Sequence, residues 1–580
     1  MKHLKLQSMD KVAANVEKIK ELFPNCTTER ITAEGKLEQA IDFDMLKQEL
    51  SDHVVEGIAE RYQFTWPDKR RAILAANAPV HKTLRPCREE SVDFDNTENL
   101  YIEGDNLEVL KLLQETYLGK VKMIYIDPPY NTGNDFVYRD DFKQSVEEYE
   151  KTSGQIDEEG NRMVTNTESN GRFHTDCLNM MYPRLKLAKD LLREDGFIAI
   201  SIGEEELDNL RKSCNEIFGE RNFRNVIAVR RYDKNLNLQF VSQGLSTMNI
   251  GLEYILIYSK NQFSKMQAVY KASTDTRSQH GYWKGFWNNA DRPTMRYELL
   301  GVAPADGQWK WMKEVADEAV RNYIEYEQFY SKTMSLEEYW RKTGSSKRFI
   351  RRNISGKGKN LGVEHWVAPS EGILRNSNWS DLLISKPISM DIKFDSPKNP
   401  DVIRTLMALF NINNASIILD FFSGSATTAH AVMQLNAEDG GKRRFIMVQL
   451  PEVCAEDSEA FKAGYKNICE IGKERIRRAG KKIKEENPLT TQDLDIGFRV
   501  LKCDSSNMED VYYTPKEYMN KQQELFVDNI KPDRIDEDLL FQVMLELDTP
   551  LSSKIIKQKM EGKTVYNVAR GISWPALTRM

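Results

Sequence analysis

The chain has 580 residues, of which 40% are hydrophobic and 29% are charged, and its formal net charge is -6. Its mean hydropathy is -0.58, and no apolar run reaches the length of a membrane span, which argues against an integral membrane protein. The amino terminus lacks the apolar core of a signal peptide, and the seven cysteines are scattered without a CxxC pair, which favours reduced thiols in the cytoplasm.

Residues 1–96 are expected to form a mostly helical region. Apolar positions recur with helical spacing over residues 11–22 and 37–61, and the region is rich in charge. Such a segment suits an accessory or dimerisation role.

Strands and helices alternate from residue 97 to 221. Strands are predicted at residues 100–103, 121–126 and 197–202, and helices at 106–113, 179–193 and 204–218. This alternation of strands and helices predicts a parallel sheet and an α/β fold. Residues 153–170 are polar and uneven, and we expect them to form a loop over the active site.

The strand at 121–126 ends in the most informative motif of the chain, Asp127-Pro128-Pro129-Tyr130. Two consecutive prolines stiffen the loop, so the Asp127 carboxylate and the Pro128 carbonyl can be aimed at the two hydrogens of a planar amine. The Tyr130 ring can stack on the attached base, once that base has been flipped out of a duplex. The alternative is an ordinary Asp-Pro-Pro surface turn after a buried strand.

Residues 222–390 break the alternation and mix aromatic with basic side chains. This composition suits phosphate contact and base stacking, although a basic run is often only a solvated face. The candidates for DNA contact are Arg230, Arg231, Lys347, Arg348, Arg351 and Arg352.

A second strand, turn and helix follow at residues 416–433. The predicted strand covers 417–419, Gly424 permits a close backbone approach, and a helix from Thr427 offers free N–H groups at its start. An ordinary strand-to-helix turn is the alternative. Further on, a strand is predicted at residues 444–449, and a long basic helix packed on the sheet is predicted at residues 458–484.

A small domain is expected at residues 498–580, and its tail is expected to be truncated or frameshifted.

Together the two turns resemble those of DNA amino-methyltransferases, in which one loop reads (D/N/S)PP(Y/F/W) and the other FxGxG. The catalytic loop comes first, as in the beta class. The segments around Gly104, Asp127, Asn170 and Pro397 resemble the modification (Mod) subunits of type III restriction-modification systems. The resemblance implies a Rossmann-like methyltransferase fold with a mostly parallel sheet and helices on both faces. It also divides the fold into a catalytic half at 97–221, target recognition at 222–390 and a cofactor half at 391–497.

The resemblance assigns residue roles in turn. The catalytic residues would be Asp127, Pro128, Pro129 and Tyr130. S-adenosyl-L-methionine would be bound by Asp105, Phe394, Lys398, Asp420, Phe422, Gly424, Gln449 and Glu452. Asp105 also suits a helix N-cap, and the segment 394–398 could be a simple connector. Two positions depart from the family pattern: Ala426 replaces the second glycine, and Gln449 stands where many relatives have a carboxylate for the ribose.

The resemblance therefore implies an N6-adenine methyltransferase that acts on double-stranded DNA, forms a homodimer and works with a restriction (Res) helicase-nuclease. No metal is expected, since the histidines form no ligand set and methyl transfer requires none. An N4-cytosine methyltransferase with the same machinery is the nearest alternative. A DNA-binding specificity subunit whose catalysis has decayed is another, motivated by Ala426 and Gln449.

Overall fold

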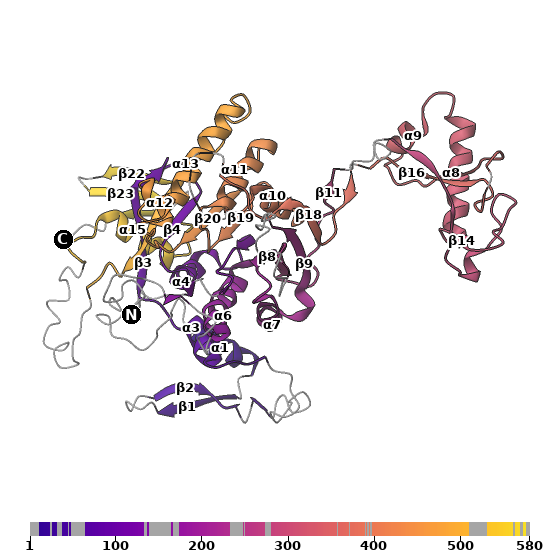
Figure 1. Ribbon diagram of the computed structural model, residues 1–580. Helices are drawn as coiled ribbons and strands as arrows, with labels where there is room; N and C mark the ends of the chain where they lie inside the picture. The colour runs from indigo at the N-terminus through magenta and orange to yellow at the C-terminus, as the bar shows by residue number, and fades with distance from the viewer. Residues whose placement is uncertain are drawn as a thin grey trace, which may run out of the picture. The chain divides into compact units, whose positions relative to one another are not determined.

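The computed structural model describes residues 11–23, 26–31, 37–43, 46–47, 64–132, 136–137, 164–165, 173–231, 248, 250–272, 280–356, 358–370, 372–388, 390, 392, 394, 397–509, 530–560, 563–568 and 572–575 (Figure 1). The chain divides into two compact units. The first comprises residues 1–267 and 377–580, and the second comprises residues 268–376.

Ten of the described strands form one sheet in the first unit, in the order β18-β9-β10-β8-β5-β19-β20-β4-β21-β3. The six from β8 to β21 run parallel, which confirms the predicted mostly parallel α/β sheet. β10 joins β8 antiparallel, and β3 joins β21 antiparallel. The strands are β3 (Lys82–Val92), β4 (Leu100–Glu103), β5 (Val121–Ile126), β8 (Leu192–Ile202), β9 (Phe223–Arg230), β10 (Leu252–Ser259), β18 (Asn378–Leu383), β19 (Ile417–Asp420), β20 (Arg444–Gln449) and β21 (Phe498–Ser505).

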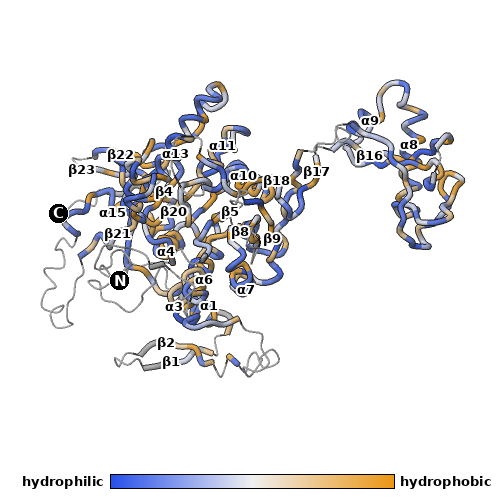
Figure 2. Tube along the Cα trace, viewed as in Figure 1, coloured by the Kyte–Doolittle hydropathy of each residue, from blue (hydrophilic) through white to orange (hydrophobic). Residues whose placement is uncertain are grey.

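Helices cover both faces of this sheet, and two apolar cores separate the layers. Along β5, Ile124 and Ile126 enter one core, whereas Met123 and Tyr125 enter the other. This alternation follows from the period of two in a strand, and hydrophobic positions gather on the central strands (Figure 2). The first core is shared with α4 (Asn106–Tyr117), α6 (Phe173–Leu191) and α7 (Leu207–Phe218). The second is shared with α10 (Pro400–Leu409), α11 (Thr427–Asp439) and α13 (Ile468–Glu486).

The first ninety-odd residues are less helical than expected. Helix α1 (Lys11–Leu22) confirms one predicted helix, and α3 (Lys69–Asn77) is another. Residues 37–41 are wrong as a helix, since β2 (Leu37–Ile41) pairs antiparallel with β1 (Thr27–Ile31). Interstrand hydrogen bonds there outweigh the helical spacing. Strand β3 also lies in this part of the chain. In the rest of the predicted helix, residues 43, 46 and 47 are helical as expected, whereas residues 44–45 and 48–61 lie outside the described residues.

Elements towards the end of the chain also differ in detail. The helix predicted over 458–484 is two helices, α12 (Glu459–Lys462) and α13, because Asn467 caps a new start by accepting from the Glu470 N–H. Strand β21 belongs to the central sheet rather than to a separate small domain. α15 (Asp536–Glu546) follows, and β22 (Ile555–Met560), β23 (Lys563–Val568) and β24 (Ile572–Pro575) form a small antiparallel sheet.

The second unit has its own sheet and aromatic cores. Its three-stranded sheet joins β12 (Tyr282–Gly285), β16 (Val363–Val367) and β15 (Ile350–Arg352). The unit also contains α8 (Lys313–Phe329), α9 (Leu336–Lys342) and two short two-stranded sheets, with Trp309, Phe286, Phe349 and Trp366 among the buried rings. The unit falls within the range predicted for target recognition, 222–390, whereas β9, β10 and β18 of that range belong to the central sheet.

Candidate active site

The loops after β5 and β19 leave the sheet side by side. These two strands are parallel neighbours, with Met123 opposite Ile418 and Ile124 opposite Leu419. From β5 the chain continues to β8 on one side, whereas from β19 it continues to β20 on the other side, so the strand order reverses between β5 and β19. Ligands of open α/β sheets bind at the carboxyl ends of strands at such a switch point. The two predicted loops, distant in sequence, therefore adjoin at this edge.

Four side chains, two from the first of these loops and two from other segments, form a charged cluster beside it. Lys398 Nζ lies 3.2 Å from Asp127 Oδ1 and donates to Glu253 Oε2 at 2.9 Å. It also donates to the Tyr130 hydroxyl at 2.6 Å, and that hydroxyl in turn donates to Glu253 Oε2 at 3.0 Å. Lys398, which was predicted to contact the cofactor, thus contacts the predicted catalytic loop.

Burial governs the ionisation of this cluster. It raises the pKa of Asp127, and the nearby Lys398 ammonium opposes that rise. Burial lowers the pKa of Lys398, but the two carboxylates outweigh this effect, so its pKa lies above the ordinary value. The pKa of the Tyr130 hydroxyl is raised well above its usual range by burial and by the adjacent carboxylates. The lysine therefore stays charged and the tyrosine stays neutral.

The end of the Asp-Pro-Pro-Tyr loop is anchored by Asn131. This residue is buried and adopts a left-handed conformation with φ 61°, which asparagine tolerates better than most residues. Its side-chain amide donates to Glu206 Oε1 at 2.6 Å and to the Phe173 carbonyl at 3.2 Å. The stiff prolines and this anchor hold the loop from both sides.

The second loop is built around a buried carboxyl group. Asp420 accepts from the Thr428 hydroxyl at 2.6 Å and from the Phe422 N–H at 3.2 Å. Burial raises the pKa of Asp420 to about 7 despite these bonds, and the charge of Asp127 adds to the rise. Gly424 follows with φ 48°, and its N–H donates to Gln449 Oε1 at 2.7 Å.

Ala426 adopts the left-handed conformation that a glycine would take more easily. It has φ 58° and ψ 42° and lies at the N-cap of α11. The methyl group is fully buried, so the loop tolerates it at a cost of roughly 1 kcal/mol in backbone strain. Ala426 therefore adopts a conformation that glycine, the residue of the family pattern, would take without this strain.

The remaining predicted cofactor residues surround this turn or the end of β4. The Phe394 ring faces Gly424, since a Cβ built on Gly424 would lie 3.6 Å from Phe394 Cζ. Asp105 caps α4 by accepting from the Leu107 and Glu108 N–H groups, which confirms the predicted cap. Glu452 follows β20, and burial raises its pKa to about 7. Phe422 is mostly buried in the sheet's first core.

The six basic residues predicted to contact DNA divide between the two units. Lys347 donates to Glu325 at 2.8 Å, and Arg351 donates to Glu364 at 3.0 Å while lying over the Trp283 ring. Those two charges are therefore largely compensated within the second unit. The remaining candidates are Arg348 over the Trp311 ring, Arg352 bonded to the Leu300 carbonyl, Arg230 exposed at the end of β9, and Arg231 3.3 Å from Glu253.

Glu253 was not predicted from the sequence to be a site residue. It is the acidic residue in the apolar strand Leu252–Ser259, and a carboxylate buried in such a strand requires a partner. That isolated charge was a usable signal. The sequence did not indicate which residues would meet it.

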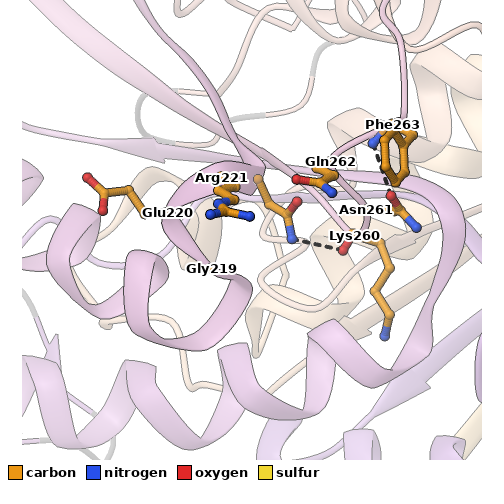
Figure 3. A pocket seen from close by; sticks show the side chains of 8 residues that line it. Gly219, Glu220, Arg221, Lys260, Asn261, Gln262 and Phe263 are labelled. Carbon is orange, nitrogen blue, oxygen red and sulfur yellow. Dashed lines mark hydrogen bonds between the residues drawn. The ribbon is translucent and has the colours of Figure 1, made fainter. Parts of the chain in front are cut away.

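A separate hollow of about 620 Å³ lies near the end of β10 (Figure 3). Its lining includes Arg221, Lys260 and the exposed Phe263, and the Asn222 side chain donates to the Lys260 carbonyl at 3.1 Å. Ser259 at the end of β10 pairs with Phe197, near the start of the apolar part of β8. The hollow thus lies at the amino edge of the parallel strands, away from the two loops.

The described part of the chain contains neither a group of three or more metal-ligating side chains nor a helix long and apolar enough to cross a membrane. The seven cysteines are free thiols.

A family match and three similar proteins indicate the same class of protein. Residues 121–479 match the DNA methylase family. The chain is 32% identical to the type III restriction-modification enzyme StyLTI Mod subunit of Salmonella typhimurium, over 82% of this chain and 71% of that protein. It is 31% identical to the EcoPI Mod subunit of Escherichia phage P1, over 77% of this chain and 72% of that protein. It is 30% identical to the EcoP15I Mod subunit of Escherichia coli, over 80% of this chain and 77% of that protein.

Proposed function

This chain belongs to the DNA methylase family, among the Mod subunits of type III restriction-modification systems, and we propose that it methylates N6 of adenine at a specific sequence in double-stranded DNA. The observation that carries the proposal is the adjacency of β5 and β19. It brings the Asp-Pro-Pro-Tyr loop beside the loop of Asp420 and Gly424. A methyl acceptor held by one loop can thus meet a cofactor held by the other.

S-adenosyl-L-methionine is the proposed cofactor, and it supplies an activated methyl group when bound. The residues fit its chemistry, because it carries a sulfonium and an ammonium while the loops carry carboxyl groups at Asp127 and Asp420. Gly424 has a left-handed backbone conformation and no side chain, so a ligand can approach its backbone closely. The Phe394 ring lies next to Gly424. Asp105, Phe422, Gln449 and Glu452 are the further proposed contacts.

Adenine is favoured over cytosine by the form of the catalytic loop. The resemblance associates Asp127 with N6-adenine enzymes, whereas N4-cytosine enzymes more often begin with serine. The Asp127 carboxylate and the Pro128 carbonyl would accept the two hydrogens of the amine, which favours the tetrahedral nitrogen needed for attack. Tyr130 would stack on the flipped base. Pro129 would keep the loop stiff.

The partners follow from the same family. We propose that the chain forms a homodimer, binds a Res subunit and works in the cytoplasm, where its free thiols remain reduced. Target recognition is assigned to residues 222–390, including the second unit, with Arg230, Arg348 and Arg352 as the main phosphate contacts. Residues 1–96 and 498–580 would serve assembly.

The test uses the purified chain, labelled S-adenosyl-L-methionine and double-stranded DNA that lacks modification. After digestion to nucleosides, we expect label in N6-methyladenine for the unmodified protein and none for Asp127→Ala, which should still bind DNA. A matched control is Asp548→Ala, which removes an exposed carboxylate paired with Lys120. Label only in N4-methylcytosine would support the cytosine alternative. No label and no heat on cofactor addition would support a decayed specificity subunit.

A further inference from the structure

Glu253 lies at the centre of the charge cluster beside the catalytic loop, and we propose that it is the positioning residue that keeps Asp127 available to the substrate amine. The inference rests on the proposed function. Glu253 belongs to neither of the two loops that resemble methyltransferase motifs. It is 6% exposed and contacts Tyr130, which belongs to the catalytic loop, and Lys398, which contacts that loop.

The sheet topology explains how a residue of β10 reaches this edge. β10 runs antiparallel to β8, with Tyr254 opposite Ile202, so the start of β10 lies beside the carboxyl end of β8. On its other side Glu253 is opposite Val229 of β9. The Lys398 segment is attached to the same edge, because Lys398 forms a β-bridge with Ser385.

The contacts of Glu253 restrain the direction of the Tyr130 ring. Its Oε2 atom accepts from the Tyr130 hydroxyl at 3.0 Å and from Lys398 Nζ at 2.9 Å. The same hydroxyl accepts from Lys398 at 2.6 Å, so both of its hydrogen-bonding sides are occupied. A ring held in this way presents one face to a stacked base before the base arrives.

The charges give Glu253 a second effect. Lys398 Nζ lies between two carboxylates, 3.2 Å from Asp127 and 2.9 Å from Glu253. With Glu253 neutral, the buried ammonium would pair with Asp127 alone and occupy the oxygen that the amine needs. With Lys398 neutral, two carboxylates would face each other, and Asp127 would take up a proton. Glu253 therefore divides the lysine charge and leaves an oxygen of Asp127 accessible to the amine, while its own charge adds to the rise in the Asp127 pKa.

Arg231 supports the outer side of Glu253. Its Nε lies 3.3 Å from Glu253 Oε1, and its backbone N–H donates to the Gly251 carbonyl at 2.9 Å. Both oxygens of Glu253 thus face a cation, so this buried side chain has a charged partner on each side. The cluster of Asp127, Glu253, Lys398 and Arg231 is balanced in formal charge.

The test compares Glu253→Gln with Glu216→Gln. Glu216 on α7 is a matched control, because it also accepts from a tyrosine hydroxyl, Tyr182 at 2.7 Å, and from a lysine ammonium, Lys69 at 2.5 Å. We expect Glu253→Gln to lower kcat by roughly tenfold to a hundredfold, while the Kd values for cofactor and DNA stay within about twofold. Glu216→Gln should leave kcat unchanged. Unchanged kcat in Glu253→Gln, or an equal loss of binding and of Tm, would overturn the inference.

A double-variant cycle with Lys398→Met tests whether the pair acts as one unit. The Lys398 substitution should cost clearly less activity in the Glu253→Gln background than alone. Additive losses would contradict the proposal. Crystal structures of the unmodified and Glu253→Gln proteins provide a readout independent of activity. We expect Lys398 Nζ to move towards Asp127 and the Tyr130 ring to turn; unmoved side chains would overturn the inference even if the unmodified protein methylates no DNA.

Discussion

Gly424 and Gln449 are joined by a hydrogen bond of 2.7 Å from the glycine N–H to the glutamine Oε1, although Gly424 follows β19 and Gln449 is the last residue of β20. The Gln449 carbonyl also accepts from the Gly104 N–H at 3.0 Å. One buried residue at the end of β20 therefore ties the turns that follow β4 and β19. This gives Gln449 a role in the shape of the proposed cofactor site that does not depend on a ribose contact.

Replacing Gln449 tests this role. In Gln449→Leu the Gly424 N–H loses its acceptor, and an unpaired amide near the site costs about 1.4 kcal/mol or more. We expect the Kd for S-adenosyl-L-methionine, measured by calorimetry, to rise by roughly tenfold. Gln449→Glu retains the acceptor but loses the bond that the amide donates to the Leu450 carbonyl at 3.2 Å, so it should bind more tightly than the leucine variant and more weakly than the unmodified protein. Equal Kd values for the leucine variant and the unmodified protein would contradict the prediction.

Asp420 should make stability depend on pH. Its pKa of about 7 in the folded protein exceeds the value of about 4 in an unfolded chain. Between about pH 4 and pH 7 the folded protein thus holds a proton that the unfolded chain has released, and this group lowers the free energy of unfolding as pH rises. In Asp420→Asn that dependence is absent. The Tm of the variant minus that of the unmodified protein should therefore increase from pH 4 to pH 7 and then level off; a constant difference would argue against a raised pKa.

Two glycines of α13 provide a matched pair of packing tests. A Cβ on Gly472 would lie 2.7 Å from the Tyr101 hydroxyl and 3.1 Å from the Gly424 carbonyl. A Cβ on Gly480 would lie 2.7 Å from Ile496 Cβ, away from that turn. Both alanine variants should lose roughly 1–3 kcal/mol of stability by overpacking. Only Gly472→Ala should also weaken S-adenosyl-L-methionine binding. If cofactor affinity falls equally in both, the loss reflects general destabilisation.

The basic residues of the second unit should differ in their contribution to DNA binding. Arg351 is paired with Glu364, whereas the Arg348 guanidinium lies over the Trp311 ring. Arg348→Ala should therefore reduce the slope of log K against log salt by about one, the effect of one lost phosphate contact. Arg351→Ala should change it less. Fluorescence anisotropy at several salt concentrations measures both slopes, and the reverse order would show that the Glu364 pair opens on DNA.

Local signals predicted much of this protein. The apolar run at 121–126, the prolines after Asp127 and the glycine turn at 424 were read correctly because each depends on neighbours along the chain. Asp105 was likewise recognised as a helix cap from its residue type and position. The helix expected at 37–61 was wrong at 37–41, where pairing with β1 decides the conformation.

The sequence by itself thus determined the strands that precede the two turns, the turns themselves and the chemical character of their loops. Tertiary structure alone decided that Lys398 and Glu253 lie beside Asp127. The physical reason is that strand order and strand direction bring distant segments to one edge of the sheet, and the pairing of β10 with β8 is set by packing over the whole core. Periodicity, proline and glycine report only on the few residues around them.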